Sequence, residues 1–599
     1  MVKQKNKILL PIVWLSLFIA IFAYCQYFLS YNYPFVEQFS FFRFSKEYAL
    51  STMNEPGGLA NYVASFLTQF YYYPVIGPLI SATLAVLITA FLDLTLKKIS
   101  SRYYFSLLSS LPALSCIWLE TDFNYYLSGT VSLALAVMAF WVYAKSAHLI
   151  SYYIRLVALT ILSWPLYYML GPNALLLVGL CVIFDLTKSD KRSLLGFFAL
   201  LVAVLCPFTL FSMELGKELS IQLLPKGYYV EVLSAPHLSY YPWIAMLLNV
   251  ILAKTVAAFS LSVGKETLWF NRVTNSIWAV GIQFMGILGI MHWGVIQYNS
   301  ATNYEVKILD YYARRGQWSQ LLQDEHLRAS KNFMHTCYQN LALSSLNLLG
   351  DKMFACPQTG FPGLFIKWNK TVNSSTLLSD VYWQLGDVAL AQEMAFEGMV
   401  ASREGANPRL LMRLVQTNLI EENYPVAEKY INLLADTYSY SSQAEKYRKL
   451  LYHDEAVLAD PELGPRKKGM KGVGLTNTDQ IMDDLLIIMR NNPDFVPPFH
   501  YFAAACLMVK DIPLFKRFIE EFHAAPALAK MPVHLQEAII LTMETDSDRW
   551  NEFGVSAKVQ ERYQEFRNTF LSYRHSPMLK RKMAIGFRDT YWYYYMFKK

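Results

Sequence analysis

The stretch YYFSLLSSLPALSCIWLETDFNYYLSGTVSLALAVMAFWVYA (residues 103–144) places a short acidic gap between two long uncharged runs. Residues 103–119 and 123–144 are each close to the roughly 20 apolar residues that a helix needs to cross a bilayer. The gap between them contains Glu120 and Asp122. The stretch therefore predicts two membrane spans joined by a tight acidic loop.

Similar runs recur throughout the first half of the chain. The protein has 599 residues, of which 54% are hydrophobic and 17% charged, and this composition is typical of a polytopic membrane protein. Residues 156–184 are interrupted by Gly171-Pro172-Asn173, which predicts two short helices or a re-entrant hairpin. With these, about nine spans are expected in a transmembrane domain over residues 1–298. The other runs are at residues 8–29, 74–92, 193–213, 242–261 and 273–291.

Basic residues set the expected orientation. If the N-terminus is inside, fourteen Lys and Arg residues fall in inner segments and only four in outer loops, namely Arg43, Lys46, Lys217 and Lys226. This bias predicts a multi-pass protein of the bacterial inner membrane, with a cytoplasmic N-terminus and a periplasmic domain after Tyr298. The net charge of +7 is then a topological signal, and no nucleic acid is expected as a partner.

The second half carries a repeated phrase. GQWSQL (316–321), GDKMFA (350–355), GDVALA (386–391) and ENYPVA (422–427) begin 34, 36 and 36 residues apart, and KDIPLF (510–515) is a weaker copy. In each phrase the first residue is expected to turn between two helices, and a small residue five positions later to lie where the helices approach closely. The pattern resembles tetratricopeptide repeats, which implies a concave helical surface for a protein or glycan partner.

These signals predict an all-α protein, a transmembrane helical bundle followed by a tetratricopeptide-like α-solenoid. We expect repeats over residues 299–457, a flexible basic loop over 458–477, and a further repeat region with an aromatic C-terminal tail over 478–599. In the exported half, Cys337 and Cys356 could form a disulfide in an oxidising compartment.

Acidic residues gather in the predicted outer loops. Glu55 precedes the helix that leads into the second span, and Glu120 and Asp122 lie between the third and fourth spans. This arrangement resembles the GT-C class of glycosyltransferases, which use polyprenyl-phosphate-linked sugars at the outer membrane face. The chain departs from that class in having Glu where the first-loop Asp is frequent, Glu-x-Asp for Asp-x-Asp, and fewer spans than many members.

The resemblance implies a catalytic role for Glu55 and a divalent cation, Mg²⁺ or Mn²⁺, held by Glu120 and Asp122. A cation on carboxylate oxygens would neutralise the leaving phosphate, while another carboxylate accepts a proton from the acceptor. Basic side chains of the outer loops could also bind that phosphate, and His237 is a candidate general base. The phosphate-binding candidates are Arg43, Lys46 and Lys226.

Each of these features also has a structural interpretation. Glu120 and Asp122 could be solvated loop ends that cap a span, and His237 could be a solvated loop residue. The tyrosines at 71–73 and the aromatic group at 240–243 could form ordinary interfacial belts or a platform that stacks sugars.

Two functions follow as hypotheses. The first is a transferase that moves a sugar or glycan from a polyprenyl-phosphate-linked donor, with membrane lipid around it and the repeat docking an acceptor. The alternative is a non-enzymatic scaffold that presents the repeat for envelope assembly. A transporter is disfavoured because the spans hold few ionisable residues. No enzyme family is matched across both halves, so an uncharacterised family of bacterial envelope proteins is expected.

Overall fold

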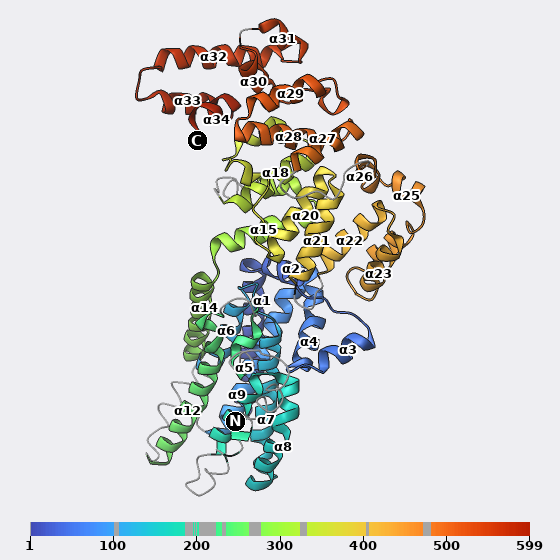
Figure 1. Ribbon diagram of the computed structural model, residues 1–599. Coiled ribbons are helices and arrows are strands. Elements are labelled where there is room, and N and C mark those ends of the chain that lie inside the picture. The colour runs from blue at the N-terminus through green and yellow to red at the C-terminus, as the bar shows by residue number, and fades with distance from the viewer. Residues whose placement is uncertain are drawn as a thin grey trace. The chain divides into compact units, whose positions relative to one another are not determined.

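The computed structural model describes residues 2–100, 107–185, 196, 198, 201–202, 223–230, 235–262, 277–323, 332–402, 407–470, 481–544 and 546–598. Over these ranges the chain is helical and contains no β-strand, which confirms the predicted all-α class. It divides into two compact units, Met1–Tyr304 (unit 1) and Glu305–Lys599 (unit 2) (Figure 1). The division lies a few residues after the predicted boundary at 298.

Unit 1 contains five segments long and apolar enough to cross a membrane, Pro11–Phe28, Ile76–Ile99, Ser128–Ser146, Tyr152–Leu170 and His237–Ala257. The predicted span at 193–213 lies almost wholly outside the described residues, so nine spans stay a prediction. At Gly171, which has a positive φ of 64°, α8 ends and α9 follows, as the two-helix form of the prediction expects. The long helices are α1 (Val2–Phe28), α5 (Ile76–Ile99), α7 (Ser128–Ser146), α8 (Tyr152–Leu170), α12 (Tyr241–Ser262) and α14 (Ile277–Tyr298), and the shorter ones α2 (Asn32–Glu37), α3 (Lys46–Met53), α4 (Gly58–Thr68), α6 (Leu107–Leu119) and α9 (Asn173–Asp185).

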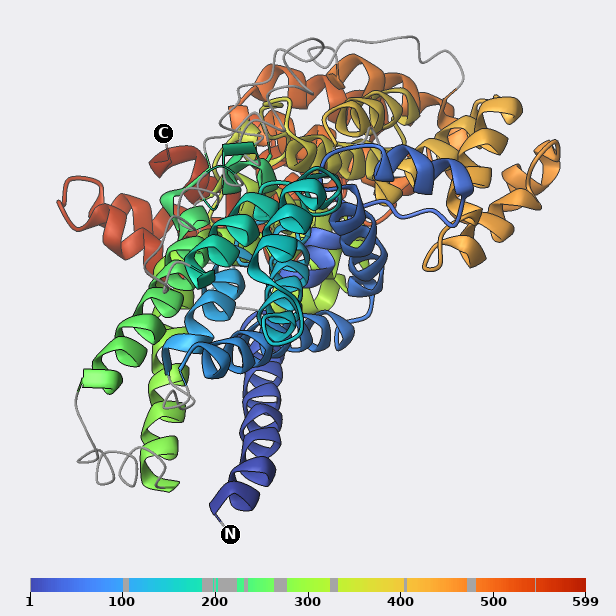
Figure 2. The ribbon, with the colours of Figure 1, turned by 90° about the horizontal axis from the view of Figure 1, so that it is seen from below.

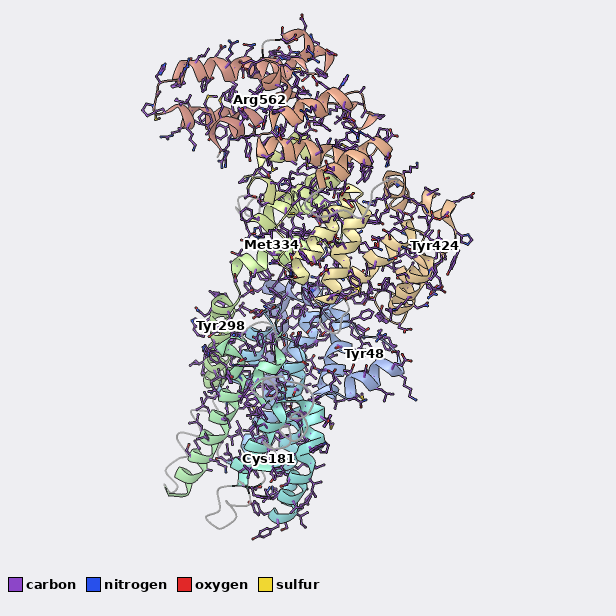
Figure 3. All side chains as sticks on the ribbon, in the orientation of Figure 1. Tyr48, Cys181, Tyr298, Met334, Tyr424 and Arg562 are labelled. Carbon is purple, nitrogen blue, oxygen red and sulfur yellow. The ribbon has the colours of Figure 1, made fainter. Side chains whose placement is uncertain are left out.

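Helix α5 lies at the centre of unit 1 and packs against α1, α6 and α7. Glycine allows the closest of these approaches: a Cβ on Gly77 of α5 would lie 2.4 Å from the ring of Tyr33, which therefore sits directly on the helix backbone. The amino-terminal turns of α1, dark blue in Figure 2, extend clear of the other helices of unit 1. Figure 3 shows Cys181 of α9 among the packed helices and Tyr48 on α3, which packs on α4.

Unit 2 is built from short helices that pack on their sequence neighbours, as α20 does on α21 and α22 on α23. Its helices are α15 (Ala301–Arg314, whose first residues belong to unit 1), α16 (Trp318–Gln323), α18 (Phe333–Ser345), α19 (Leu349–Lys352), α20 (Val372–Leu385), α21 (Val388–Val400), α22 (Pro408–Ile420), α23 (Tyr424–Ala435), α24 (Ser441–Arg448), α25 (Asp454–Ala459), α26 (Leu463–Gly469), α27 (Ile481–Asn491), α28 (Val496–Val509), α29 (Ile512–Phe522), α30 (Val533–Thr542), α31 (Ser547–Glu552), α32 (Ala557–Tyr573), α33 (Leu579–Phe587) and α34 (Tyr591–Phe597).

The repeated phrase marks a repeated turn. Its first residue has a positive φ in four copies, at Gly316, Gly386, Glu422 and Lys510. In each of these copies the next residue donates its backbone N–H to a carbonyl five residues earlier, which closes the end of the first helix. In the remaining copy the turn falls at Asn347, with φ 57°, and the predicted turn residue, the glycine at 350, lies inside α19. The predicted register is therefore wrong in that copy, where asparagine tolerates the left-handed conformation instead of glycine.

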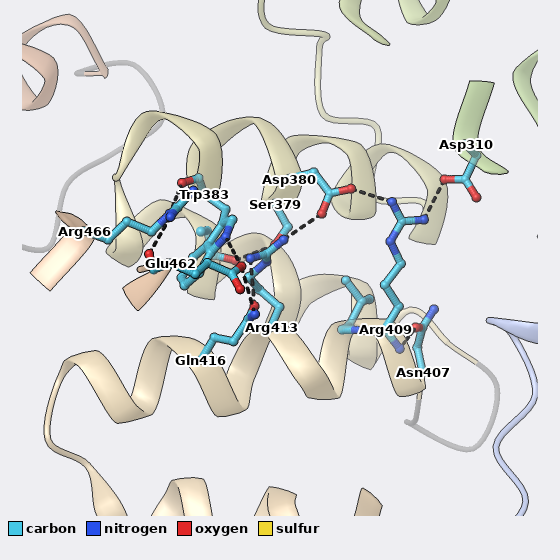
Figure 4. Close-up of polar contacts among 12 residues, drawn as sticks. Asp310, Ser379, Asp380, Trp383, Asn407, Arg409, Arg413, Gln416, Glu462 and Arg466 are labelled. Carbon is cyan, nitrogen blue, oxygen red and sulfur yellow. Dashed lines mark hydrogen bonds and ion pairs between the residues drawn. The ribbon is translucent and has the colours of Figure 1, made fainter. Parts of the chain in front are cut away.

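Part of the predicted flexible loop is helical. Residues 463–469 form α26, and Arg466 is buried, with Nε donating to the carbonyl of Trp383 at 2.7 Å. The guanidiniums of Arg413 and Arg466 lie 4.3 Å and 4.4 Å from the centre of the Trp383 ring (Figure 4). Arg466 is therefore a packing residue, because its guanidinium stacks on the Trp383 ring of α20. Residues 471–477 of the predicted loop lie outside the described ranges.

Two further predictions concern unit 2. The C-terminal tail forms α34, in which Tyr591 and Trp592 are fully buried, and the Trp592 indole N–H donates to the Glu537 carbonyl at 2.8 Å. The tail is thus part of the core of unit 2. Cys337 and Cys356 are both buried and form no disulfide; the Cys337 thiol donates instead to the carbonyl of Leu364 at 3.3 Å. The suggested disulfide is therefore wrong.

Candidate functional site

Glu120 lies where three helices of unit 1 meet. It follows directly on Leu119, the last residue of α6, so its side chain projects from the end of that helix. Its Oε2 accepts a hydrogen bond from Ser81 Oγ of α5 at 2.5 Å, and its Oε1 accepts one from Thr130 Oγ1 of α7 at 3.0 Å. Both carboxylate oxygens are therefore held by hydroxyl groups from neighbouring helices.

Tyrosine rings surround this carboxyl group. A cavity of about 280 Å³, including the part open to solvent, is lined by Asn32, Tyr33, Val36, Tyr71, Glu120, Tyr125 and Leu127. The Tyr33 and Tyr71 rings pack edge to face with their centres 5.1 Å apart. Burial raises the pKa of Tyr33, Tyr71 and Tyr125 well above the ordinary value, so these phenols stay neutral. The cavity thus offers aromatic faces, neutral hydroxyl groups and one carboxyl group.

The carboxyl group of Glu120 has no cationic partner in the part of the chain that the structure describes. Removal from bulk water raises its pKa to about 7, and the hydrogen bonds from Ser81 and Thr130 oppose this rise by stabilising the charged form. Glu120 keeps a partly exposed surface, as expected for a residue that lines an open cavity. A carboxyl group that titrates near neutrality, beside a cavity, can accept and release protons under physiological conditions.

Asp122 serves a different purpose from Glu120. Its Oδ1 accepts hydrogen bonds from the backbone N–H and from the side-chain Nδ2 of Asn124, both at 3.0 Å. This arrangement stabilises the turn between α6 and α7, and Asp122 does not line the cavity. Among the described residues no group of three His, Cys, Asp or Glu side chains could hold a metal ion. A cation shared by Glu120 and Asp122 alone therefore stays a prediction.

The other predicted site residues lie apart from this cavity. Glu55 is exposed in the turn between α3 and α4, where its carbonyl accepts from the N–H of Gly58 at 2.9 Å. The Arg43 guanidinium lies 5.5 Å from the ring centre of Tyr48. The remaining three are on short helices, where Lys46 begins α3, Lys226 lies in the 3-10 helix Pro225–Tyr228, and His237 begins the 3-10 helix His237–Tyr240. None of the five lines the cavity beside Glu120.

Sequence reasoning missed most of the groups around Glu120. Ser81 and Thr130 gave no signal, because hydroxyl residues are common in apolar helices. Tyr71 belongs to the predicted tyrosine cluster, but its side chain is buried in the cavity wall and does not form a surface belt, whereas Tyr73 is exposed. The helix α2, which contributes three of the lining residues, also ends in the buried Glu37.

The loop that carries Glu120 pairs with a distant segment of unit 1. Tyr126 N–H donates to the carbonyl of Tyr228 at 2.9 Å, and Val230 N–H donates to the carbonyl of Asn124 at 3.1 Å. These bonds flank an isolated antiparallel bridge between Tyr125 and Tyr229. The segment after α6 is thereby fixed, which holds Tyr125 in the cavity wall.

Comparison with known proteins shows one family. A family described as "Family of unknown function (DUF6057)" matches residues 4–598. The chain belongs to this family. The match to DUF6057 extends over both units, so the combination of the apolar helical unit and the helical unit 2 is a property of the family as a whole. No curated protein and no solved structure matches the chain.

Proposed function

We propose that unit 1 is a membrane-embedded transferase that moves a sugar or glycan from a polyprenyl-phosphate-linked donor to an extracytoplasmic acceptor, with Glu120 as its general base. The observation that supports this most directly is a carboxyl group of pKa about 7 in a tyrosine-lined cavity. The cavity lies at the ends of α5, α6 and α7, of which α5 and α7 are candidate spans. A lipid-linked substrate would present its reacting group at such a position.

The reaction would proceed by proton transfer and displacement. An acceptor hydroxyl transfers its proton to the Glu120 carboxylate as its oxygen bonds to the sugar carbon, and the bond from that carbon to the phosphate oxygen breaks with the electron pair leaving on phosphate. A base whose pKa lies near the operating pH is effective in both accepting and later releasing the proton. Ser81 and Thr130 hold the carboxylate in one orientation during this step.

The charge of the leaving phosphate requires neutralisation. A bound divalent cation would supply it by Lewis-acid stabilisation, although the described residues contain no group of three His, Cys, Asp or Glu side chains to hold one. Arg43, Lys46 and Lys226 remain candidates for phosphate binding because all three lie in predicted outer loops. Each carries a positive charge in a segment that joins apolar helices, where a lipid phosphate would lie.

Unit 2 would lie in the periplasm as a tetratricopeptide-like docking domain for the acceptor or a protein partner. The positive-inside bias and nine spans would place it outside the cytoplasm, and unit 1 in a bacterial inner membrane. The recurring left-handed turns of unit 2 support a repeat architecture, since each closes one helix and starts the next.

A second function has its own supporting observation. Glu55, the predicted catalytic acid, is exposed outside the cavity, and Asp122, one of the two predicted metal ligands, stabilises a turn. A scaffold that anchors unit 2 for envelope assembly needs no reacting group in unit 1. The two functions differ in what they require of Glu120, and this difference is testable.

The test is complementation of a deletion strain with single variants, scored by the surface glycan of the cell and by protein abundance in the membrane fraction. Glu120→Gln should fail to restore the surface glycan although the variant protein reaches normal abundance in the membrane, because an amide cannot accept the proton. Asp122→Asn should be tolerated, since the amide oxygen can still accept from Asn124. Glu47→Gln, on the exposed face of α3, is the matched control. Full complementation by Glu120→Gln would favour the scaffold.

A further inference from the structure

The positive charge of the protein is concentrated near its C-terminus. Residues 557–599 contain ten Lys and Arg but only three Asp and Glu, so this segment carries a net charge of +7, which is the value for the whole chain. The charges of residues 1–556 therefore cancel. Within the segment, residues 566–588 contain six Lys and Arg and no Asp or Glu. Such a concentration of positive charge indicates an anionic partner.

The segment folds into a helical hairpin of α32 and α33, followed by α34. Arg562 of α32 pairs with Asp589, just after α33, at 2.8 Å. At the other end of the hairpin, the Lys582 ammonium of α33 lies 5.6 Å from the ring centre of Tyr573 in α32. The two helices are therefore antiparallel, and the turn at residues 574–578 forms the tip of the hairpin (Figure 1).

Core contacts fix which side of the hairpin meets the solvent. Met583 and Phe587 of α33 are buried, and the Phe587 ring packs edge to face on the buried Phe566 of α32 with the ring centres 5.3 Å apart. Phe566 packs in turn on Trp592 of α34, with the ring centres 5.4 Å apart. One side of each helix is thus held against the core of unit 2, and the opposite side is presented outwards.

The outward side of each helix combines basic and aliphatic residues in the same order. An exposed aliphatic residue lies four positions after one exposed arginine and three positions before another, a spacing that places all three on one helix face. Ile585 is 77% exposed and Leu571 54% exposed, although both are aliphatic. The two sets, which we call the hairpin face, are Arg567-Leu571-Arg574 in α32 and Arg581-Ile585-Arg588 in α33.

We propose that the hairpin face binds the surface of an anionic phospholipid bilayer. Lys and Arg side chains would pair with the lipid phosphates, while Leu571 and Ile585 enter the boundary between headgroups and acyl chains. The exposed aliphatic residues favour a bilayer over a nucleic acid, which basic residues bind through its phosphates without aliphatic partners. The candidate spans of unit 1 belong to the same chain, so a bilayer is present wherever the protein is inserted. The proposal is independent of the reaction assigned to Glu120.

The experiment measures binding to separate vesicles. The full-length protein is reconstituted in nanodiscs of phosphatidylcholine, which has no net charge, and mixed with vesicles of phosphatidylcholine alone or of equal parts phosphatidylcholine and phosphatidylglycerol. Flotation of the vesicles should carry the protein with them only when phosphatidylglycerol is present, and added salt should weaken the binding because it screens the charges. Empty nanodiscs are the blank. Equal binding to both kinds of vesicle would overturn the proposal.

Charge variants locate the binding surface. Each basic residue near an anionic surface contributes about fivefold to binding, so removal of three charges from the hairpin should lower the affinity for the anionic vesicles roughly 100-fold. The variant combines Lys580→Gln, Arg581→Gln and Lys582→Gln. A matched control removes the same charge from exposed positions of unit 2 outside the hairpin and should bind nearly as the wild type does. It combines Lys516→Gln, Arg517→Gln and Lys530→Gln. Equal losses in the two variants would mean that overall charge drives the binding, and would overturn the proposal.

An apolar variant distinguishes a bilayer from other anionic partners. Ile585→Ser should lower the affinity for the anionic vesicles about fivefold or more, because a buried isoleucine side chain contributes to insertion. Val400→Ser, which changes a residue of α21 that is 65% exposed, is the control and should have no effect. Unchanged binding by Ile585→Ser would mean that charge alone acts, which would favour a nucleic acid or an acidic protein and overturn the proposal. Glu120→Gln should bind the vesicles as the wild type does, so failure of the proposed reaction would leave this result intact.

Discussion

Glu120 in unit 1 and Asp380 in unit 2 are both carboxyl groups largely removed from water, but their surroundings differ in charge. Asp380 pairs with the guanidiniums of Arg409 and Arg413, the latter at 2.9 Å (Figure 4). Although burial by itself would raise its pKa, these two arginines lower the pKa of Asp380. Among the described residues Glu120 accepts hydrogen bonds from two hydroxyl groups, and burial raises its pKa to about 7.

The comparison separates two uses of a buried acid. The ion pairs of Asp380 belong to a larger network, since Arg409 also pairs with Asp310 at 2.6 Å and Arg413 stacks on Trp383. Such a network fixes how several helices pack. An acid that burial makes harder to ionise, as Glu120 is, reduces stability at neutral pH and is characteristic of a functional site. The predictions below test this contrast, in order of decreasing effect.

The largest loss of folding stability is expected from Asp380→Asn. The substitution leaves the buried charges of Arg409 and Arg413 without their shared partner, and breaking a buried ion pair on one side costs roughly 3 kcal/mol or more. Pulse proteolysis of the full-length protein in increasing urea, followed at fragments of unit 2, should show a lower unfolding midpoint. A midpoint within error of the wild type would mean that the network does not hold the helices together.

Glu120 and Asp380 are expected to change the folding stability with pH in opposite directions. Because the folded-state pKa of Glu120 is raised above its unfolded value of 4.5 to about 7, its contribution to stability falls as the pH rises from about 4.5 to 7. The loss is on the order of 2 kcal/mol after allowance for the partial solvation of the cavity. Asp380, whose pKa is lowered, contributes stability that is lost only as the pH falls through its folded pKa.

The measurement is the Tm of the wild type and of Glu120→Gln at pH 5 and pH 8. The wild type should lose more stability than the variant between these values, because glutamine does not titrate. An equal loss in both proteins would show that Glu120 ionises normally, and the general-base proposal would then lack its electrostatic support.

A smaller loss of folding stability is expected at Asp122, the acid next to Glu120 in the loop. Asp122→Ala should cost about 1 kcal/mol, since it removes the acceptor of two hydrogen bonds in the turn, while Asp122→Asn should cost much less. Thermal unfolding of unit 1 measures both. Loss of the glycan phenotype in Asp122→Asn at normal stability would instead make Asp122 part of the reacting site.

The smallest effect is expected at an exposed ion pair. Glu445 lies 3.0 Å from Arg448, and its side chain is 60% exposed, so solvent screens the attraction. Glu445→Gln should change stability by about 0.5 kcal/mol or less. It is the control for Asp380→Asn in the same urea series, and a loss as large as that of Asp380→Asn would mean that the assay reports overall charge.

How far the sequence predicts this protein differs between its two units. In unit 2 a left-handed turn needs particular residue types at a fixed place, so Gly316 and Gly386 could be recognised from the period alone. The copy at Gly350 was misplaced by three residues because Asn347 also tolerates this conformation. Arg466, which the sequence places in a basic loop, stacks on Trp383, a contact between residues far apart in the chain.

By itself the sequence determined the helical class, the apolar helices of unit 1, the repeated turns of unit 2 and the acidic loop at Glu120, because each depends on composition or on residues close in the chain. The tertiary structure decided which of the two loop acids faces a cavity. Glu120 and Asp122 look equivalent in the sequence, but Ser81 and Thr130 come from two other helices to hold the first, while Asn124 engages the second locally. Contacts between distant segments set the dielectric and the hydrogen bonds of a carboxyl group, and with them its pKa.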